Sequence, residues 1–150
     1  GLPVLDRSLF ADAVNIEKGG YIISDCSNAD VLIFATGSEV WVALDVKKQL
    51  PDLNIKVVNL GCWELFEEQD EKYKRDVLSC ADAALLVSLE AGITSGWQKY
   101  TGRNGLNIGI DTFGESAPGN DVADHFGLTP DKVKKTIMNK LEEIKWEKYH

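Results

Sequence analysis

Apolar runs of strand length alternate with helical patterns along most of this chain. The run within residues 81–92 reads Ala-Asp-Ala-Ala-Leu-Leu-Val-Ser-Leu and ends in Glu90, Ala91 and Gly92. A near-continuous apolar run is typical of a strand that is buried on both faces of a sheet. We therefore expect a central strand here, with Glu90 at its carboxyl end.

Shorter runs predict four other strands, at residues 21–26, 31–35, 55–60 and 106–110. The turn between the first two, residues 27–30, is too short for a crossover, so these strands pair antiparallel if they are neighbours. Residues 40–50 have a helical pattern that Pro51 closes. This helix makes a crossover between the second and third strands, which are thus expected to run parallel.

Helical patterns occupy the remaining segments. Residues 70–78, 93–100 and 121–126 are each expected to form a helix, and residues 62–66 a loop or a short helix. In the last helix, Thr129 suits the N-cap and Pro130 the first position. One apolar stripe follows at Val133, Ile137, Leu141 and Ile144. Together these patterns predict a three-layer α/β/α domain with a five-stranded, mostly parallel sheet and one antiparallel edge strand.

The length of 150 residues is that of one ordinary domain. Residues 1–18 show no sustained period and are interpreted as a lead-in, whereas residues 19–150 form the domain. No window is apolar for long enough to span a bilayer, and the N-terminus lacks a basic region followed by an apolar core. We therefore expect a cytoplasmic protein.

Charge and cysteine usage exclude several kinds of partner and site. The net charge is −8, whereas nucleic acid and anionic membranes bind clustered Lys and Arg, so we expect neither as a partner. Cys26, Cys62 and Cys80 are odd in number, far apart and without paired spacing. This pattern predicts reduced thiols rather than a disulfide framework or a zinc site.

Three turns follow predicted strands, where open α/β sheets usually bind ligands. They lie at residues 36–39, 90–92 and 113–116. Thr36, Gly37 and Ser38 resemble an anion cradle, because a glycine lets the backbone turn and the next helix presents free N–H groups. Gly114 and Ser116 are further candidate anion-binding residues in the third turn.

Glu39 weakens the interpretation of the first turn as an anion site. A carboxylate in the first turn of a helix already uses the favourable field of the helix and would repel a phosphate. The favoured alternative is a self-capped helix start, since short glycine motifs match by accident.

Glu90 and Glu115 could form a carboxylate pair for acid–base work at the same edge of the sheet. The favoured alternative is that each accepts backbone hydrogen bonds in its own turn or meets a basic side chain such as Lys99 or Arg103. Neither acid has a nucleophile, a histidine or a metal-ligand set near it in the sequence.

The two histidines, His125 and His150, make neither a metal pattern nor a triad pattern. We therefore predict no catalytic, cofactor-binding or metal-binding residue in this chain. The four tryptophans are expected to be core or interface anchors: Trp41, Trp63, Trp97 and Trp146.

Several segments taken together resemble the C-terminal domain of transketolase, and the resemblance runs across essentially the whole chain. They are Lys18-Gly19-Gly20-Tyr21, Ala35-Thr36-Gly37-Ser38-Glu39-Val40, Glu90-Ala91-Gly92, residues 111–118 (Asp-Thr-Phe-Gly-Glu-Ser-Ala-Pro) and Phe126-Gly127-Leu128-Thr129. One departure is Glu115, where the family more often has a small residue. This extra carboxylate argues against an anion at that turn.

The resemblance implies a part of a homodimeric enzyme that uses thiamine diphosphate and a divalent metal. Transketolases transfer two-carbon ketol units between sugar phosphates in the pentose phosphate pathway, and their cofactor-binding and catalytic residues lie in the two preceding domains. The Gly-Asp-Gly metal and diphosphate signature of those domains is absent here. The implied partners are the preceding domains and a second subunit, and the implied role is structural and dimer-supporting, without activity of the chain alone.

Two alternatives stay open. The chain could be a small-anion or nucleotide-binding regulatory module, or the equivalent domain of another thiamine-diphosphate enzyme, such as a deoxyxylulose phosphate synthase or a 2-oxoacid dehydrogenase. Leu2-Pro3 is similar to the connector through which family members enter this domain, so we expect a piece of a longer enzyme. Such a piece should expose an apolar surface, which we expect to involve the lead-in and part of the helix around Trp97.

Overall fold

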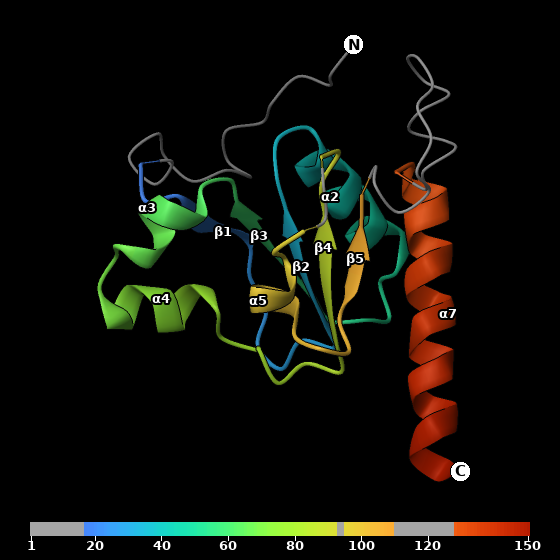
Figure 1. Ribbon diagram of the computed structural model, residues 1–150. Helices are drawn as coiled ribbons and strands as arrows, with labels where there is room; N and C mark the ends of the chain where they lie inside the picture. Colours follow the sequence, from blue (N-terminus) through green and yellow to red (C-terminus); the bar gives the residue numbers. More distant parts are fainter. Residues whose placement is uncertain (1–16, 93–94, 110–127) are drawn as a thin grey trace.

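A computed structural model describes residues 17–92, 95–109 and 128–150 of this chain (Figure 1). These residues form a five-stranded sheet with the strand order β1-β3-β2-β4-β5. The strands are β1 (Gly20–Ser24), β2 (Val31–Ala35), β3 (Ile55–Leu60), β4 (Leu85–Leu89) and β5 (Leu106–Ile108). β1 runs antiparallel to β3 and the other neighbours are parallel, which confirms the predicted sheet with one antiparallel edge strand.

The pairing of β1 differs from the expected hairpin. β1 pairs with β3 rather than with β2. β2 has no free edge, because Val31 lies opposite both Ile55 of β3 and Leu85 of β4. The loop after β1 therefore passes the end of β3 on its way to β2. The middle strand of the sheet is β2. Strand β4, which was expected to be central, is an interior strand between β2 and β5.

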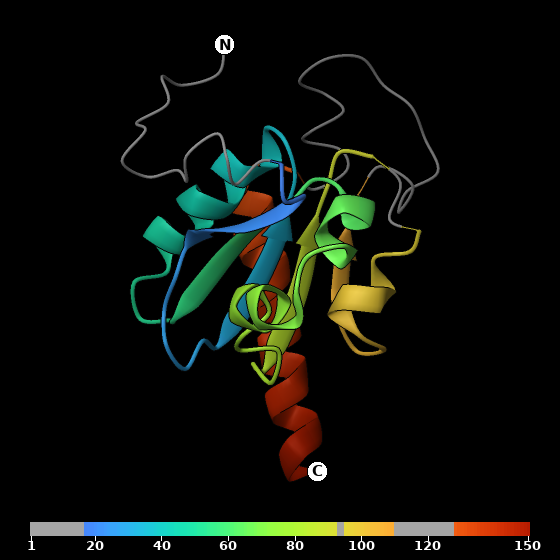
Figure 2. The same ribbon diagram turned by 90° about the vertical axis from the view of Figure 1, so that its left-hand side faces the viewer.

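Two layers of helices cover the sheet, as the alternation of elements predicts (Figures 1 and 2). α2 (Glu39–Gln49) and α7 (Pro130–Tyr149) lie on one face. The other face carries α3 (Trp63–Glu67), α4 (Glu71–Val77) and α5 (Gln98–Thr101). β2 alternates between the two cores, because successive side chains of a strand point to opposite faces.

The apolar stripe of α7 packs as its spacing predicts. Val133 and Ile137 are fully buried, and Leu141 and Ile144 are partly buried against the same core. Thr129 occupies the N-cap position, but its side chain makes no capping hydrogen bond. Past the stripe, residues 145–150 are exposed, and the end of the helix extends beyond the sheet (Figure 1).

The segment around Trp97 corrects two expectations. Its helix is shorter than residues 93–100, because Gly96 with φ of +90° precedes it and only Gln98–Thr101 are helical. Trp97 is 0% exposed and thus belongs to the core instead of an open apolar surface. Residues 93–94, the lead-in up to residue 16 and the helix expected at 121–126 lie outside the described residues. The large apolar side chains that are exposed in the described part are Leu65, Met138, Trp146 and Tyr149.

Candidate functional site

The connections of the sheet place a switch point between β2 and β4. The chain leaves β2 through α2 on one face and reaches β3, and it leaves β3 through α3 and α4 on the other face and reaches β4. In open α/β sheets, ligands bind outside the carboxyl ends of the strands at such a point. The turn at Thr36–Ser38 and the end of β4 at Glu90 both lie there.

The turn between β2 and α2 is built on Gly37. Its φ of +56° lies in the left-handed region, which a glycine adopts without steric strain. The N–H of Glu39 donates to the Thr36 carbonyl at 3.1 Å, so the turn closes directly onto the helix. Ser38 already has helical backbone angles and makes no side-chain cap; its hydroxyl instead donates to Glu39 Oε1 at 3.3 Å. Ser38 thus does not cap the helix, whereas the Glu39 carboxylate accepts a hydrogen bond from its own backbone N–H, as the expected self-capped start implies.

Glu39 extends toward the end of β4. Burial raises the pKa of the Glu39 carboxyl above its ordinary value, and the charge of Glu90 acts in the same direction. The backbone of Ala91 opposes these effects by hydrogen bonding to the carboxylate. The sequence did not predict this approach. Glu90 was expected to accept backbone hydrogen bonds in its own turn or to meet Lys99 or Arg103, and the carboxylate considered beside it was Glu115, which lies outside the described residues.

Within the part of the chain that the structure describes, Glu90 is held by the core and forms no ion pair with a Lys or Arg. The indole Nε1–H of Trp97 donates to Glu90 Oε2 at 2.5 Å. Lys99, one of the expected partners, instead pairs with Glu67 at 3.3 Å. The indole also lies edge-on to Trp63 with the ring centroids 4.9 Å apart, so the orientation of the carboxylate is fixed by aromatic packing.

Among the described residues, this edge offers acids and weakly polar groups. Two surface hollows, of about 340 and 420 Å³, share Gly61 and Cys62, and neither is lined by a described Lys or Arg. Asn59 donates to the Tyr21 hydroxyl at 3.1 Å in the larger hollow, a contact that strand spacing alone does not predict. Within the described residues, no group of three or more His, Cys, Asp and Glu side chains is arranged to hold a metal ion.

The structure describes only some of the residues that were predicted to bind an anion. Thr36, Gly37 and Ser38 lie together at the switch point, and Glu39 stands beside them. Gly114 and Ser116 lie outside the described residues. Since Glu39 and Glu90 give this edge negative charge, its electrostatics oppose phosphate binding.

Glu39→Gln should stabilise the chain at neutral pH. A carboxyl whose folded-state pKa is raised contributes stability below its unfolded pKa, and this contribution is lost as pH rises through the folded pKa. We expect an increase of about 0.5 kcal/mol in the free energy of unfolding at pH 7, since partial exposure reduces the effect. The difference should disappear near pH 4, as measured by urea unfolding at both pH values. Glu142→Gln on the outside of α7 is the control. An equal gain in stability in that variant would contradict the attribution of the effect to the burial of Glu39.

Comparisons with known proteins agree with this geometry. Residues 19–129 match the family described as the transketolase-like TK C-terminal domain. A transketolase of Aquifex aeolicus (strain VF5) is 46% identical over 139 residues, which are 91% of this chain and 20% of that protein. A chloroplastic transketolase of Solanum tuberosum is 45% identical over 121 residues, 77% of this chain and 16% of that protein.

A solved structure gives the same relation. Transketolase from Pichia stipitis, in a complex with sedoheptulose 7-phosphate, superposes with a TM-score of 0.78 at 32% identity, over 91% of this chain and 20% of that chain. The chain thus spans about a fifth of the length of the relatives it matches. None of the described helices combines the length and apolar character needed to cross a membrane.

The family match and the 46% identity to the Aquifex aeolicus enzyme show where the chain belongs. It is a member of the transketolase family, and its matched residues 19–129 are a transketolase C-terminal domain.

Proposed function

We propose that this chain is the structural C-terminal domain of a cytoplasmic transketolase of the pentose phosphate pathway. The whole enzyme would transfer two-carbon ketol units between sugar phosphates with thiamine diphosphate and a divalent metal. This domain would support the homodimer by packing against the preceding domains and the second subunit. It would have no activity alone.

The observation that carries this proposal is the 46% identity to Aquifex aeolicus transketolase across 91% of the chain. The described part of the domain supports a non-catalytic role as well. At the switch point, Glu90 is bonded to Trp97 of the domain's own core, and Glu39 is partly buried beside it. Both carboxylates thus accept hydrogen bonds from groups of this domain itself.

The described residues do not fit thiamine diphosphate. A diphosphate requires donors and positive charge, whereas the carboxyl edge presents Glu39 and Glu90. The divalent metal that accompanies it takes carboxylate and carbonyl oxygens, and the described acidic residues form no such group of three. We therefore assign the cofactor to the other domains of the enzyme.

A domain exchange tests the proposal. This chain is fused in place of the C-terminal domain of Aquifex aeolicus transketolase, and ketol transfer and dimerisation are measured for the chimera. We expect activity within about tenfold of the parent, a barrier change of about 1.4 kcal/mol or less. A truncated parent without the domain should lose dimer stability, and this chain alone should show no turnover. Turnover by the chain alone, or thiamine diphosphate binding to it in calorimetry, would overturn the proposal.

The same material tests the regulatory alternative. Phosphate and nucleotides are titrated into the chain and into a Gly37→Ala variant. Saturable binding that Gly37→Ala abolishes would favour an anion-binding module at Thr36, Gly37 and Ser38. The acidic edge leads us to expect no saturation.

A further inference from the structure

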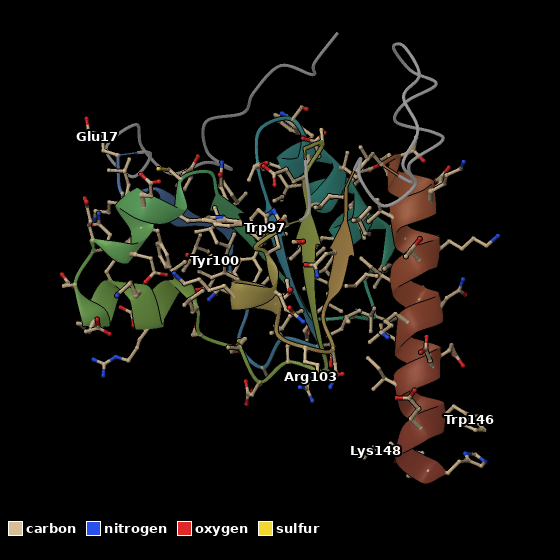
Figure 3. The ribbon with its side chains drawn as sticks, in the orientation of Figure 1. Glu17, Trp97, Tyr100, Arg103, Trp146 and Lys148 are labelled. Atoms are coloured by element: carbon tan, nitrogen blue, oxygen red, sulfur yellow. The ribbon has the colours of Figure 1, made fainter. Side chains whose placement is uncertain are left out.

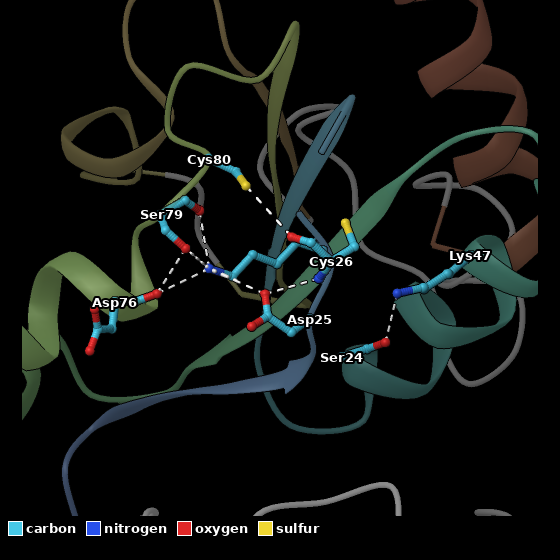
Figure 4. A network of polar contacts seen from close by, with 8 residues as sticks. Ser24, Asp25, Cys26, Lys47, Asp76, Ser79 and Cys80 are labelled. Carbon is cyan, nitrogen blue, oxygen red and sulfur yellow. Dashed lines mark hydrogen bonds and ion pairs between the residues drawn. The ribbon is translucent and has the colours of Figure 1, made fainter. Parts of the chain in front are cut away.

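The amino edge of the sheet, opposite the switch point, carries two cysteines on two different loops. Cys26 lies in the loop between β1 and β2, and Cys80 lies in the connection from α4 to β4 (Figure 4). Both line one surface hollow of about 470 Å³, together with Asp25, Ser27, Asn28 and Ser79. Both cysteines therefore border one hollow that is open to the surface.

The two cysteines are in direct contact. Cys80 Sγ lies 3.7 Å from the carbonyl oxygen of Cys26, and both thiols are free and partly buried. The carbonyl and the side chain of Cys26 branch from the same Cα, and its sulfur can change position by rotating between staggered rotamers. Cys80 also has φ of +76°, a backbone conformation that is uncommon outside glycine and is found at functional positions.

Positive charge stands close to both thiols. The Lys56 ammonium is fully buried and hydrogen-bonds to Ser79 Oγ at 2.7 Å, on the residue before Cys80. Burial raises the pKa of the Cys26 thiol, while the charges of Lys47 and Lys56 oppose this rise by favouring the thiolate. On balance the pKa of the Cys26 thiol is raised, because the charges of Cys80 and Asp25 act in the same direction as burial, so its thiolate forms at alkaline pH with the two ammonium groups offsetting part of the cost.

We propose that Cys26 and Cys80 form a redox-active thiol pair that a low-molecular-weight disulfide oxidises to an intramolecular disulfide. One thiol loses its proton and its thiolate attacks the external disulfide, which forms a mixed disulfide and releases one small thiol. The second thiolate then attacks the cysteine sulfur of that mixed disulfide and releases the other small thiol. The two cysteines lose two electrons and two protons, and the external disulfide gains them.

The consequence is a reversible link between two loops that no strand pairing joins. The bond would connect residues 26 and 80 across a segment that contains β2, β3 and the intervening helices. It would hold the rim of the hollow beside the buried Lys56. This inference does not rest on the proposed function, because it concerns the opposite edge of the sheet.

The test uses the whole chain with Cys62→Ser. Cys62 follows β3 at the carboxyl edge, so it is remote from the pair. Its replacement leaves Cys26 and Cys80 as the two cysteines of the chain, and the wild-type chain, which keeps Cys62, is the control. The variant is incubated with oxidised glutathione at pH 8 and its intact mass and peptide map are recorded. We expect the loss of two hydrogen atoms, no retained glutathione, a peptide link between Cys26 and Cys80, and full reversal by dithiothreitol.

Two further variants separate pairing from simple thiol accessibility. Cys26→Ser and Cys80→Ser, each combined with Cys62→Ser, should keep a free thiol or one bound glutathione and show no internal link. The proposal is overturned if the folded Cys62→Ser protein retains two free thiols, or carries two glutathiones, while the same protein unfolded in urea is oxidised by the reagent. It is likewise overturned if the peptide map of the wild-type chain links Cys62 instead.

Discussion

Trp97→Ala is expected to lower the free energy of unfolding by about 4 kcal/mol. The side chain is 0% exposed and is the largest in the core on the α5 side of the sheet. Its ring packs on Phe34 of β2 at 6.3 Å between centroids and on Trp63 at 4.9 Å. Its removal therefore leaves a large cavity and also deprives Glu90 of the indole N–H. Urea unfolding followed by far-UV circular dichroism measures the loss without depending on tryptophan emission.

Trp146→Ala is the matched control for this change. Trp146 lies near the end of α7 (Figure 3) and is 62% exposed. Its ring stacks on His150. Its replacement should cost less than about 1 kcal/mol, because little apolar area is removed from water at that site. Trp97→Phe keeps much of the buried ring but lacks the donor to Glu90, and we expect a loss of about 2 kcal/mol. Equal losses for Trp97→Ala and Trp146→Ala would contradict the burial of the α5 segment.

Local patterns predicted the elements of this fold well because each depends on a few adjacent residues. The continuous apolar runs correspond to β2, β3 and β4, and the stripe from Val133 to Ile144 lies on the core. The order of the strands could not be read in this way. The short turn at residues 27–30 is compatible with a hairpin, but β2 has a parallel partner on each edge, and this is decided by segments far along the chain.

The candidate site was predicted only as far as backbone position. Gly37 and Glu90 were expected at strand ends and lie there. The approach of Glu39 to Glu90 and the bond from Trp97 depend on side-chain directions across separate elements, which spacing does not give. One signal was available and was not used: Lys56 stands in the otherwise apolar start of β3, where a lysine requires buried partners.

Lys56→Ala is expected to lower the free energy of unfolding by about 3 to 4 kcal/mol. The side chain is 0% exposed, and its ammonium donates to Ser79 Oγ at 2.7 Å and to the carbonyls of Ser79 and Asp76 at 3.0 and 3.2 Å. Asp25, whose side chain is 64% exposed, adds an ion pair at 3.8 Å. The ammonium thus ties the loop after α4 to β3, and alanine would leave a cavity and remove the Lys56 donor from the Ser79 carbonyl, while the Asp76 carbonyl keeps the bond from the Ser79 hydroxyl.

Lys56→Met separates the two contributions. Methionine retains most of the buried methylene volume but cannot donate, so the loss should fall to about 2 kcal/mol, which reports the hydrogen bonds alone. Lys99→Met is the control, because Lys99 is 58% exposed and pairs with Glu67 at 3.3 Å, and such surface pairs contribute less than about 1 kcal/mol. If Lys56→Met were as stable as the wild-type chain, the buried ammonium would add nothing beyond the packing of its stem. If only the alanine variant lost stability, Lys56 would stabilise the fold by filling volume in the core and not by its hydrogen bonds.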